Sequence, residues 1–197
     1  AQPRQGLATA DNFRFLRYWW EVGTANIGFG CRDAGEAMAS KKKWFPYMKG
    51  GSFRRWYGNQ EYVVNWENDG AEIKTIGIES GRVVSRPQNT SFYFRPGVTW
   101  NALSSAGFSA RLMPKGFIIG HKGPGLYCDS MDHLYTILGL LNSVLFENLL
   151  TIVSPTIDFN VGQLGLLPVC DTSSIGIKSK VETAVGYAKA FEAEDEA

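Results

Sequence analysis

The chain has 197 residues, of which 44% are hydrophobic and 20% are charged, and its formal net charge is +1. This length can supply one domain with a hydrophobic core, and the composition excludes a disordered or fibrous chain. No apolar run reaches the roughly 18 residues of a membrane span, and the start lacks the pattern of a signal peptide. We therefore expect a cytoplasmic protein without a membrane partner. Because the chain begins without methionine, we also expect it to be a segment of a longer protein.

The first predicted element is a helix over residues 11–22, capped by Asp11 or Asn12. The glycine-rich stretch 23–35 that follows is expected to be an irregular loop. The helical spacing assigns four side chains to the core rather than to a ligand platform. These are Phe15, Leu16, Trp19 and Trp20.

Between residues 41 and 119, short runs of aromatic and β-branched residues alternate with turn signals. This texture predicts a curled, mostly antiparallel β-sheet packed with a few helices, an α+β fold. A short helix is expected near residues 69–76. The runs expected to form strands are 61–66, 82–84, 91–94 and 117–119.

Leucines at spacings of three and four predict one long helix over residues 131–150. Gly139 in its middle indicates the close packing of a neighbour, since glycine weakens a helix. Alternating residues 157–161 predict a half-buried strand.

The tail is expected to form a helix over residues 178–191 and an acidic, frayed end over 192–197. We therefore divide the chain into a domain of residues 1–175 and a C-terminal helix and tail of residues 176–197.

The small net charge hides a separation of charge along the chain. Residues 41–122 hold 13 Lys and Arg against 5 Asp and Glu, a net of +8, and the remaining residues carry a net of −7. A basic middle of this kind favours a polyanionic partner, although charges can also cluster by chance on solvated loops.

Basic residues in this middle part are interleaved with aromatics and amides. Residues 41–59 hold six cations and six aromatics, and residues 82–90 form a second patch. Lys and Arg neutralise phosphates, whereas Arg, Gln and Asn can make bidentate contacts to bases. Gly50 and Gly51 would let the backbone approach a phosphate closely. The alternative is a surface loop that its aromatics anchor to the core.

Signatures of enzymes are mostly absent. The chain contains no Gly-x-Ser-x-Gly elbow and no phosphate-binding loop, and all eight prolines are isolated, so no Asn-Pro-Pro-aromatic motif is present. Glu67 and Asp69 could serve a hydrolase, but carboxylates beside Gly70 are more often part of a turn. The widely spaced Cys and His residues predict reduced thiols and no metal site. They are Cys31, Cys128, Cys170, His121 and His133.

Several motifs in series resemble the C-terminal half of PglX-type adenine-specific DNA methyltransferases, which belong to BREX phage-defence systems. They are RFLRYWWEV at 14–22, WFPYMKGG at 44–51, FRRWYGN at 53–59, VVNWENDG at 63–70, SRPQNT at 85–90 and GVTW at 97–100. The later motifs are similar to TaqI-like target recognition domains. They are LGLLNS at 138–143, PTIDFNVG at 155–162 and LPV at 167–169.

This resemblance covers about residues 10–170 and implies a division of labour. An upstream catalytic domain would bind S-adenosylmethionine and methylate the N6 amine of a flipped adenine, while this chain reads double-stranded DNA. Because the chain lacks the catalytic and cofactor motifs, we expect it to be inactive alone, without a catalytic residue or cofactor of its own. It would choose where methylation occurs.

The family does not say which residues touch DNA, so these are predicted from the charge pattern. The strongest phosphate candidates are Lys41, Lys42, Lys43, Lys49, Arg54 and Arg55, and the weaker ones are Arg95, Arg111, Lys115 and Lys122. The candidates for base readout are Arg86, Gln88 and Asn89. Four tryptophans are expected to be structural. These are Trp44, Trp56, Trp66 and Trp100.

The alternative function is a protein-interaction module that docks other defence-system subunits or a phage inhibitor. The helix predicted at 178–191 and the acidic tail are the features that would suit this role.

Overall fold

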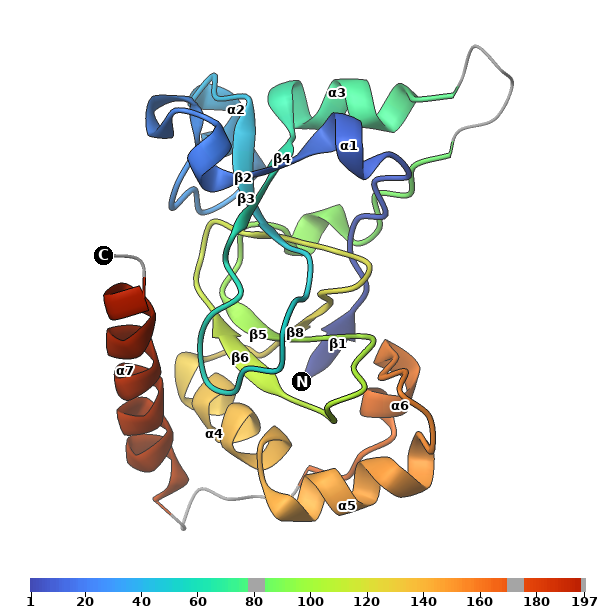
Figure 1. The fold of residues 1–197 in the computed structure, drawn as a ribbon, viewed down its shortest axis with the longest axis vertical. Helices are drawn as coiled ribbons and strands as arrows, with labels where there is room; N and C mark the ends of the chain where they lie inside the picture. Colours follow the sequence, from blue (N-terminus) through green and yellow to red (C-terminus); the bar gives the residue numbers. More distant parts are fainter. Residues whose placement is uncertain (78–83, 170–175, 196–197) are drawn as a thin grey trace.

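The structure, a computed structural model, describes residues 1–77, 84–169 and 176–195. In this part of the chain, seven α-helices and two four-stranded β-sheets form an α+β fold. The sheets lie in two halves stacked along the long axis of the molecule, and the N-terminal segment runs from one half to the other (Figure 1). The α+β class is therefore confirmed, but the predicted single sheet is two sheets.

The sheet of the first half has the strand order β2-β4-β3-β7. Strand β4 is antiparallel to both β2 and β3, whereas β7 pairs with β3 in parallel. The predicted strands at 61–66 and 117–119 are confirmed as β4 and β7. The bounds are β2 Leu16–Tyr18, β3 Trp44–Met48, β4 Tyr62–Asn65 and β7 Ile118–Ile119.

The sheet of the second half is antiparallel throughout, with the order β1-β8-β5-β6. All four residues of β5 and of β6 are buried. One face of these strands packs in the hydrophobic core of the second half with helix α4 (Met131–Leu141), and Met113 on the other face belongs to the core of the first half. The bounds are β1 Gln2–Arg4, β5 Gly97–Trp100, β6 Ala110–Met113 and β8 Gly125–Tyr127.

The helices divide between the halves (Figure 1). The first half holds α1 Asn12–Phe15, α2 Ala34–Ala39 and α3 Glu67–Thr75, and α3 confirms the helix expected near 69–76. The second half holds α4 Met131–Leu141, α5 Val144–Val153, α6 Val161–Gly165 and α7 Ile177–Asp195.

Each half has its own hydrophobic core. The first core surrounds Phe45 and Trp66, and the second surrounds Trp100 and Leu138. The structural role expected for Trp66 and Trp100 is confirmed, since both are at most 1% exposed. The indole of Trp100 donates a 2.7 Å hydrogen bond to the carbonyl oxygen of Phe159.

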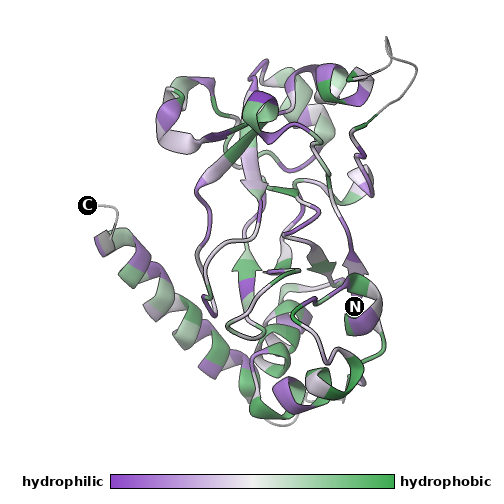
Figure 2. Cartoon of the chain, turned by 45° about the vertical axis from the view of Figure 1, so that its right-hand side comes forward, coloured by the Kyte–Doolittle hydropathy of each residue, from purple (hydrophilic) through white to green (hydrophobic). Residues whose placement is uncertain are grey.

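Helix α7 packs against α4 at the position where the sequence indicated close packing. A Cβ atom on Gly139 would lie 2.7 Å from side-chain atoms of both Ile177 and Val181. Hydrophobic and hydrophilic residues are interspersed along α7 (Figure 2). Val181 and Val185, four residues apart, are buried, whereas Tyr187 and Phe191 are exposed. The predicted tail helix is thus confirmed, and it continues to Asp195 rather than fraying from residue 192.

The helix predicted over residues 11–22 is wrong beyond its first turn. Asp11 caps α1 as expected, but the helix ends at Phe15 because the next three residues pair with β4. A 3₁₀ turn at Trp19–Glu21 follows. Trp20 was assigned to the core but is 56% exposed.

The helix predicted over residues 131–150 is broken in two. The Asn142 side chain accepts a hydrogen bond from the Ala110 amide and donates one to the Ala110 carbonyl oxygen, both at 2.9 Å, which ties α4 to β6. Ser143 then caps α5. Among the described residues no single helix is long and apolar enough to cross a membrane; α4 and α5 reach that length only together, bent by 72°.

Two further predictions of strands fail. Residues 90–92 form a 3₁₀ turn instead of a strand, and the stretch 157–161 contributes only one bridge, between Asp158 and Leu103. The strand expected at 82–84 lies largely outside the described residues, as does Cys170.

Candidate nucleic-acid interface

A half-open crevice of about 310 Å³ lies where the N-terminal segment passes β3 and the loop after β7. Lys49 and Lys122, two of the predicted phosphate contacts, line it together. The other lining residues are Leu7, Ala8, Thr9, Ala10, Asn12, Tyr47 and His121.

The N-terminal segment is fixed in this crevice by backbone hydrogen bonds. Leu7 donates to the carbonyl oxygen of Ile119 and accepts from the amide of His121, each at 2.9 Å. Its carbonyl oxygen also accepts a 2.9 Å bond from the Tyr47 hydroxyl. Ala8 and Arg86 exchange two bonds of 3.0 and 2.9 Å, so this segment brings Arg86 to the same region.

Close backbone packing holds Lys49 and Lys122 on neighbouring loops. A Cβ atom on Gly123 would lie 2.5 Å from the Met48 carbonyl oxygen, and one on Gly50 would lie 3.0 Å from that of Lys122. Gly50 has a φ of +93°, which favours glycine. The glycines therefore allow the two lysines to sit at one crevice.

The crevice is electropositive. Lys122 and Arg86 are exposed, and within the described part of the chain neither they nor Lys49 forms an ion pair with a carboxylate. The Lys49 ammonium lies 4.1 Å from the centre of the Tyr62 ring, a cation–π contact. Burial lowers the pKa of His121 below its ordinary value of 6.5, and the charges of Lys122 and Arg86 lower it further.

Arg111, a weaker phosphate candidate, is fully buried and is corrected to a structural role. Its guanidinium donates to the Asn101 side-chain oxygen at 2.7 Å and to the Arg54 carbonyl oxygen at 3.2 Å. The Asn101 amide in turn donates to the Gly51 carbonyl oxygen at 2.8 Å. Arg111 thus anchors the loop of residues 50–59, and burial lowers its pKa to about 10.

Arg54 and Arg55 lie on that loop, but carboxylates already hold them. Arg54 pairs with Glu192 of α7, and Arg55 lies 3.3 Å from a carboxylate oxygen of Glu147 of α5. Both arginine side chains are about one-third exposed. A phosphate would have to compete with these carboxylates.

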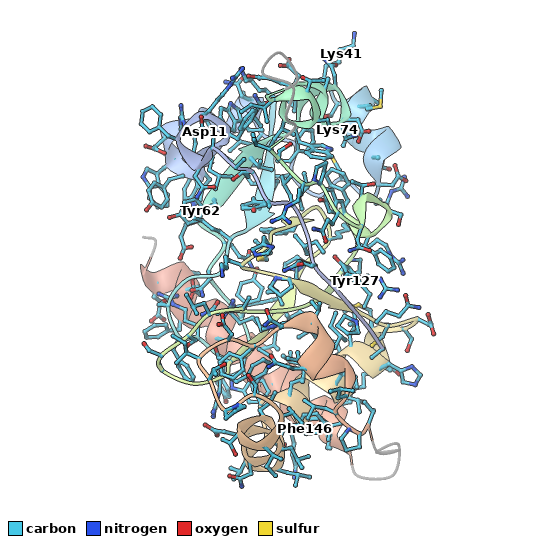
Figure 3. All side chains as sticks on the ribbon, turned by 90° about the vertical axis from the view of Figure 1, so that its right-hand side faces the viewer. Asp11, Lys41, Tyr62, Lys74, Tyr127 and Phe146 are labelled. Atoms are coloured by element: carbon cyan, nitrogen blue, oxygen red, sulfur yellow. The ribbon has the colours of Figure 1, made fainter. Side chains whose placement is uncertain are left out.

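The remaining phosphate candidates lie apart from the crevice. Lys41 is at the end of the molecule, far from Tyr62 beside Lys49 (Figure 3). Lys42 donates to the Ala25 carbonyl oxygen, and Lys43 stacks on Trp44. Lys115 is exposed between β6 and β7.

Arg95 faces another side of the molecule. It lies over the rings of Phe92 and Tyr127, and Tyr127 is on the opposite side from Tyr62 in Figure 3. The basic residues therefore form separate groups rather than one continuous surface.

The three candidates for base readout lie on one stretch but differ in freedom. Arg86 is exposed, and Gln88 is half-buried. Asn89 has a φ of +53°, and its amide donates a 2.9 Å bond to the Gln5 carbonyl oxygen. Arg86 and Asn89 are thus both exposed, but the Asn89 amide is already engaged by the Gln5 carbonyl oxygen.

Sequence reasoning missed an exposed aromatic cluster next to Lys49. The rings of Tyr18 and Trp20 stack with centroids 4.6 Å apart, and the Tyr62 hydroxyl donates a 3.0 Å bond to that of Tyr18. Reading residues 16–20 as a strand would have placed Tyr18 and Trp20 on the same side.

Glu67 and Asp69 lie at the start of α3, in a left-handed turn that precedes its regular part, as the alternative interpretation expected. Asn68, Asp69 and Gly70 are all left-handed, and Asp69 accepts from the indole of Trp66 at 3.3 Å and from Lys74 at 2.6 Å. In the described ranges, no three Cys, His, Asp or Glu gather to hold a metal ion.

No protein-family model matches the chain. It is 38% identical over 187 residues to the adenine-specific methyltransferase PglX of Lacticaseibacillus casei (strain Zhang), covering 94% of this chain and 15% of that protein. It is 37% identical over 157 residues to the adenine-specific methyltransferase BrxX of Escherichia coli O9:H4 (strain HS), covering 79% of this chain and 12% of that protein. The chain is homologous to a segment of these methyltransferases. It spans less than a sixth of their length, and the predicted resemblance is confirmed at this level.

Proposed function

We propose that this chain is a target recognition domain that reads double-stranded DNA for a site-specific N6-adenine methyltransferase of a BREX or related restriction-modification system. The observation that carries this proposal is the group of cations around the crevice, Lys49, Arg86 and Lys122, which form no ion pair with any carboxylate that the structure describes. Homology to PglX and BrxX over most of the chain supports the same function.

Different residues of the crevice would contact the DNA backbone and the DNA bases. Lys49 and Lys122, whose ammonium groups have no carboxylate partner among the described residues, are suited to phosphates, which set affinity and position. Arg86 can donate two hydrogen bonds to guanine in the major groove. Gln88 and Asn89 would assist it, and Asn89 would have to release the Gln5 carbonyl oxygen to use its amide.

Methyl transfer itself belongs in this proposal to a separate catalytic domain of the longer protein. That domain would bind S-adenosylmethionine and hold the flipped adenine, and this chain contains no Asn-Pro-Pro-aromatic motif for the task. The chain would contribute binding energy to the correct sequence only.

The methylated motif of a methyltransferase that carries this chain tests the assignment of roles. Sequencing of modified DNA from cells should show that Arg86→Ala or Gln88→Ala relaxes one position of the motif, because a lost bidentate contact costs about 1–3 kcal/mol of discrimination. Lys49→Ala should lower the extent of methylation without changing the motif. An unchanged motif in both readout variants would refute their role in base reading.

A further inference from the structure

A second pocket, of about 390 Å³, is lined by Tyr62, whose ring carries the Lys49 ammonium, and its walls are mainly aromatic and apolar side chains. Its size and lining are typical of small-ligand pockets. The wall includes Phe29, Tyr57, Gln60, Tyr62 and Lys115.

The side-chain amide of Gln60, which lines this pocket, is only partly satisfied by the residues that the structure describes. The Gln60 side-chain oxygen accepts a 3.2 Å hydrogen bond from the Tyr57 hydroxyl. The Gln60 amide nitrogen is buried and has no hydrogen-bond acceptor in the described structure. Because an unsatisfied buried donor is costly, turning the Gln60 amide outward onto the hydrogen-bond acceptor of a ligand would relieve this cost.

The pocket also has positive charge at two points and touches the proposed DNA surface. Lys115 lines it, and the Lys189 ammonium lies 5.1 Å from the centre of the Tyr57 ring. Tyr62, a wall of the pocket, carries the Lys49 ammonium on its ring. A ligand in the pocket can therefore be continuous with an anionic chain bound at Lys49.

We infer that this pocket binds a single unstacked nucleobase, with aromatic side chains against the ring, the Gln60 amide on a ring or carbonyl acceptor, and Lys115 near a phosphate. This inference rests on the proposed function only for the source of the base. An aromatic wall suits any base, since every base has a π-face. The same chemistry would accept a base of a DNA strand or a free nucleotide.

Fluorescence of 2-aminopurine tests the inference, because stacking on aromatic rings quenches it. One arm titrates the chain into a short single-stranded oligonucleotide that carries one 2-aminopurine; the other uses the 2-aminopurine nucleoside monophosphate. Saturable quenching in the first arm alone assigns the pocket to DNA strands, and quenching in both assigns it to nucleotides in general. In both cases the quenching is assigned to this pocket only if Phe29→Ala and Gln60→Met weaken it.

Phe29 and Phe13 provide a matched pair, since both are exposed, by 58% and 91%, and only Phe29 lines the pocket. Phe29→Ala should weaken the quenched complex about fivefold or more, and Phe13→Ala should leave it unchanged. Gln60→Met, which removes the donor but keeps the volume, should weaken it about 3- to 10-fold.

Absence of quenching in both arms, or equal effects of the two phenylalanine variants, would overturn the inference. Salt-dependent duplex binding that persists without quenching would overturn the pocket alone and leave the proposed function intact. Quenching of the nucleoside monophosphate without any duplex binding would support the pocket and overturn the proposed function.

Discussion

Replacing the buried Arg111 should have two separate effects. It should release the loop of residues 50–59, and it should change the free energy of unfolding of the whole chain only moderately. Arg111→Met keeps most of the side-chain length but removes the donors to the Asn101 side-chain oxygen and the Arg54 carbonyl oxygen. Each buried acceptor left without a donor costs about 1–3 kcal/mol, so the two together cost about 2–6 kcal/mol.

Relief of a buried charge opposes this loss. Burial lowers the pKa of Arg111 from 12.5 to about 10, which corresponds to about 3 kcal/mol against the charged form. The guanidinium is still charged at pH 7, so the unmodified chain bears this cost of burying a charge. The methionine variant does not bear it, which offsets part of the lost hydrogen bonding. We therefore expect the free energy of unfolding to fall by at most about 3 kcal/mol, while the loop loses its anchor.

Urea denaturation and amide hydrogen exchange measure the two effects separately. Exchange should accelerate at the Trp56 amide, which donates a 2.9 Å bond to the Ala110 carbonyl oxygen beside Arg111. Arg95→Met, at an exposed arginine, is the control and should change stability by less than about 0.5 kcal/mol. Unchanged exchange in the loop, or a loss of stability well above 3 kcal/mol, would refute the reasoning.

Three further predictions concern α7, the crevice and the packing of α4. Glu192→Gln should free Arg54 and raise duplex affinity by up to about fivefold at low salt; Glu194→Gln is the control in fluorescence anisotropy, and equal effects would argue against competition by Glu192. The lowered pKa of His121 means that the unfolded chain binds a proton more readily, so stability should fall as pH drops below 6.5. Thermal melts of His121→Gln should show a smaller fall between pH 7 and 5.5 than those of the unmodified chain, and an identical fall would contradict the prediction. Gly139→Ala should destabilise the chain by about 1–3 kcal/mol despite better helix propensity, because its Cβ meets α7; a gain in the midpoint of urea unfolding would contradict that packing.

The spacing of apolar residues along the sequence correctly predicted those helices and strands whose tertiary contacts agree with that spacing. Strand β4, helix α3 and helix α7 follow this rule. The pattern failed at residues 16–20, where pairing with β4 overrides a helical spacing. It failed again at Asn142, whose side chain bonds to a strand about thirty residues earlier and breaks a continuous leucine pattern. Such contacts are set by tertiary structure and leave no local signal.

The candidate site was predictable in its chemistry but not in its arrangement. The charge pattern pointed to Lys49, Arg86 and Lys122, but it could not show that the N-terminal segment brings Arg86 toward the two lysines. Nor could it distinguish these cations from Arg111, which is buried, or from Arg54, which α7 neutralises. Burial and ion pairing of a charged side chain depend on residues distant in sequence.

The salt dependence of duplex binding tests the central claim most directly. With about five phosphate contacts, the slope of log affinity against log salt should lie between about −4 and −5 for the chain. Combined replacement of Lys49 and Lys122 by glutamine should make the slope shallower by roughly 1.8, about 0.9 for each lost phosphate contact. An affinity that does not change with salt, or the same slope in the chain and the double variant, would contradict the proposal that this crevice binds DNA.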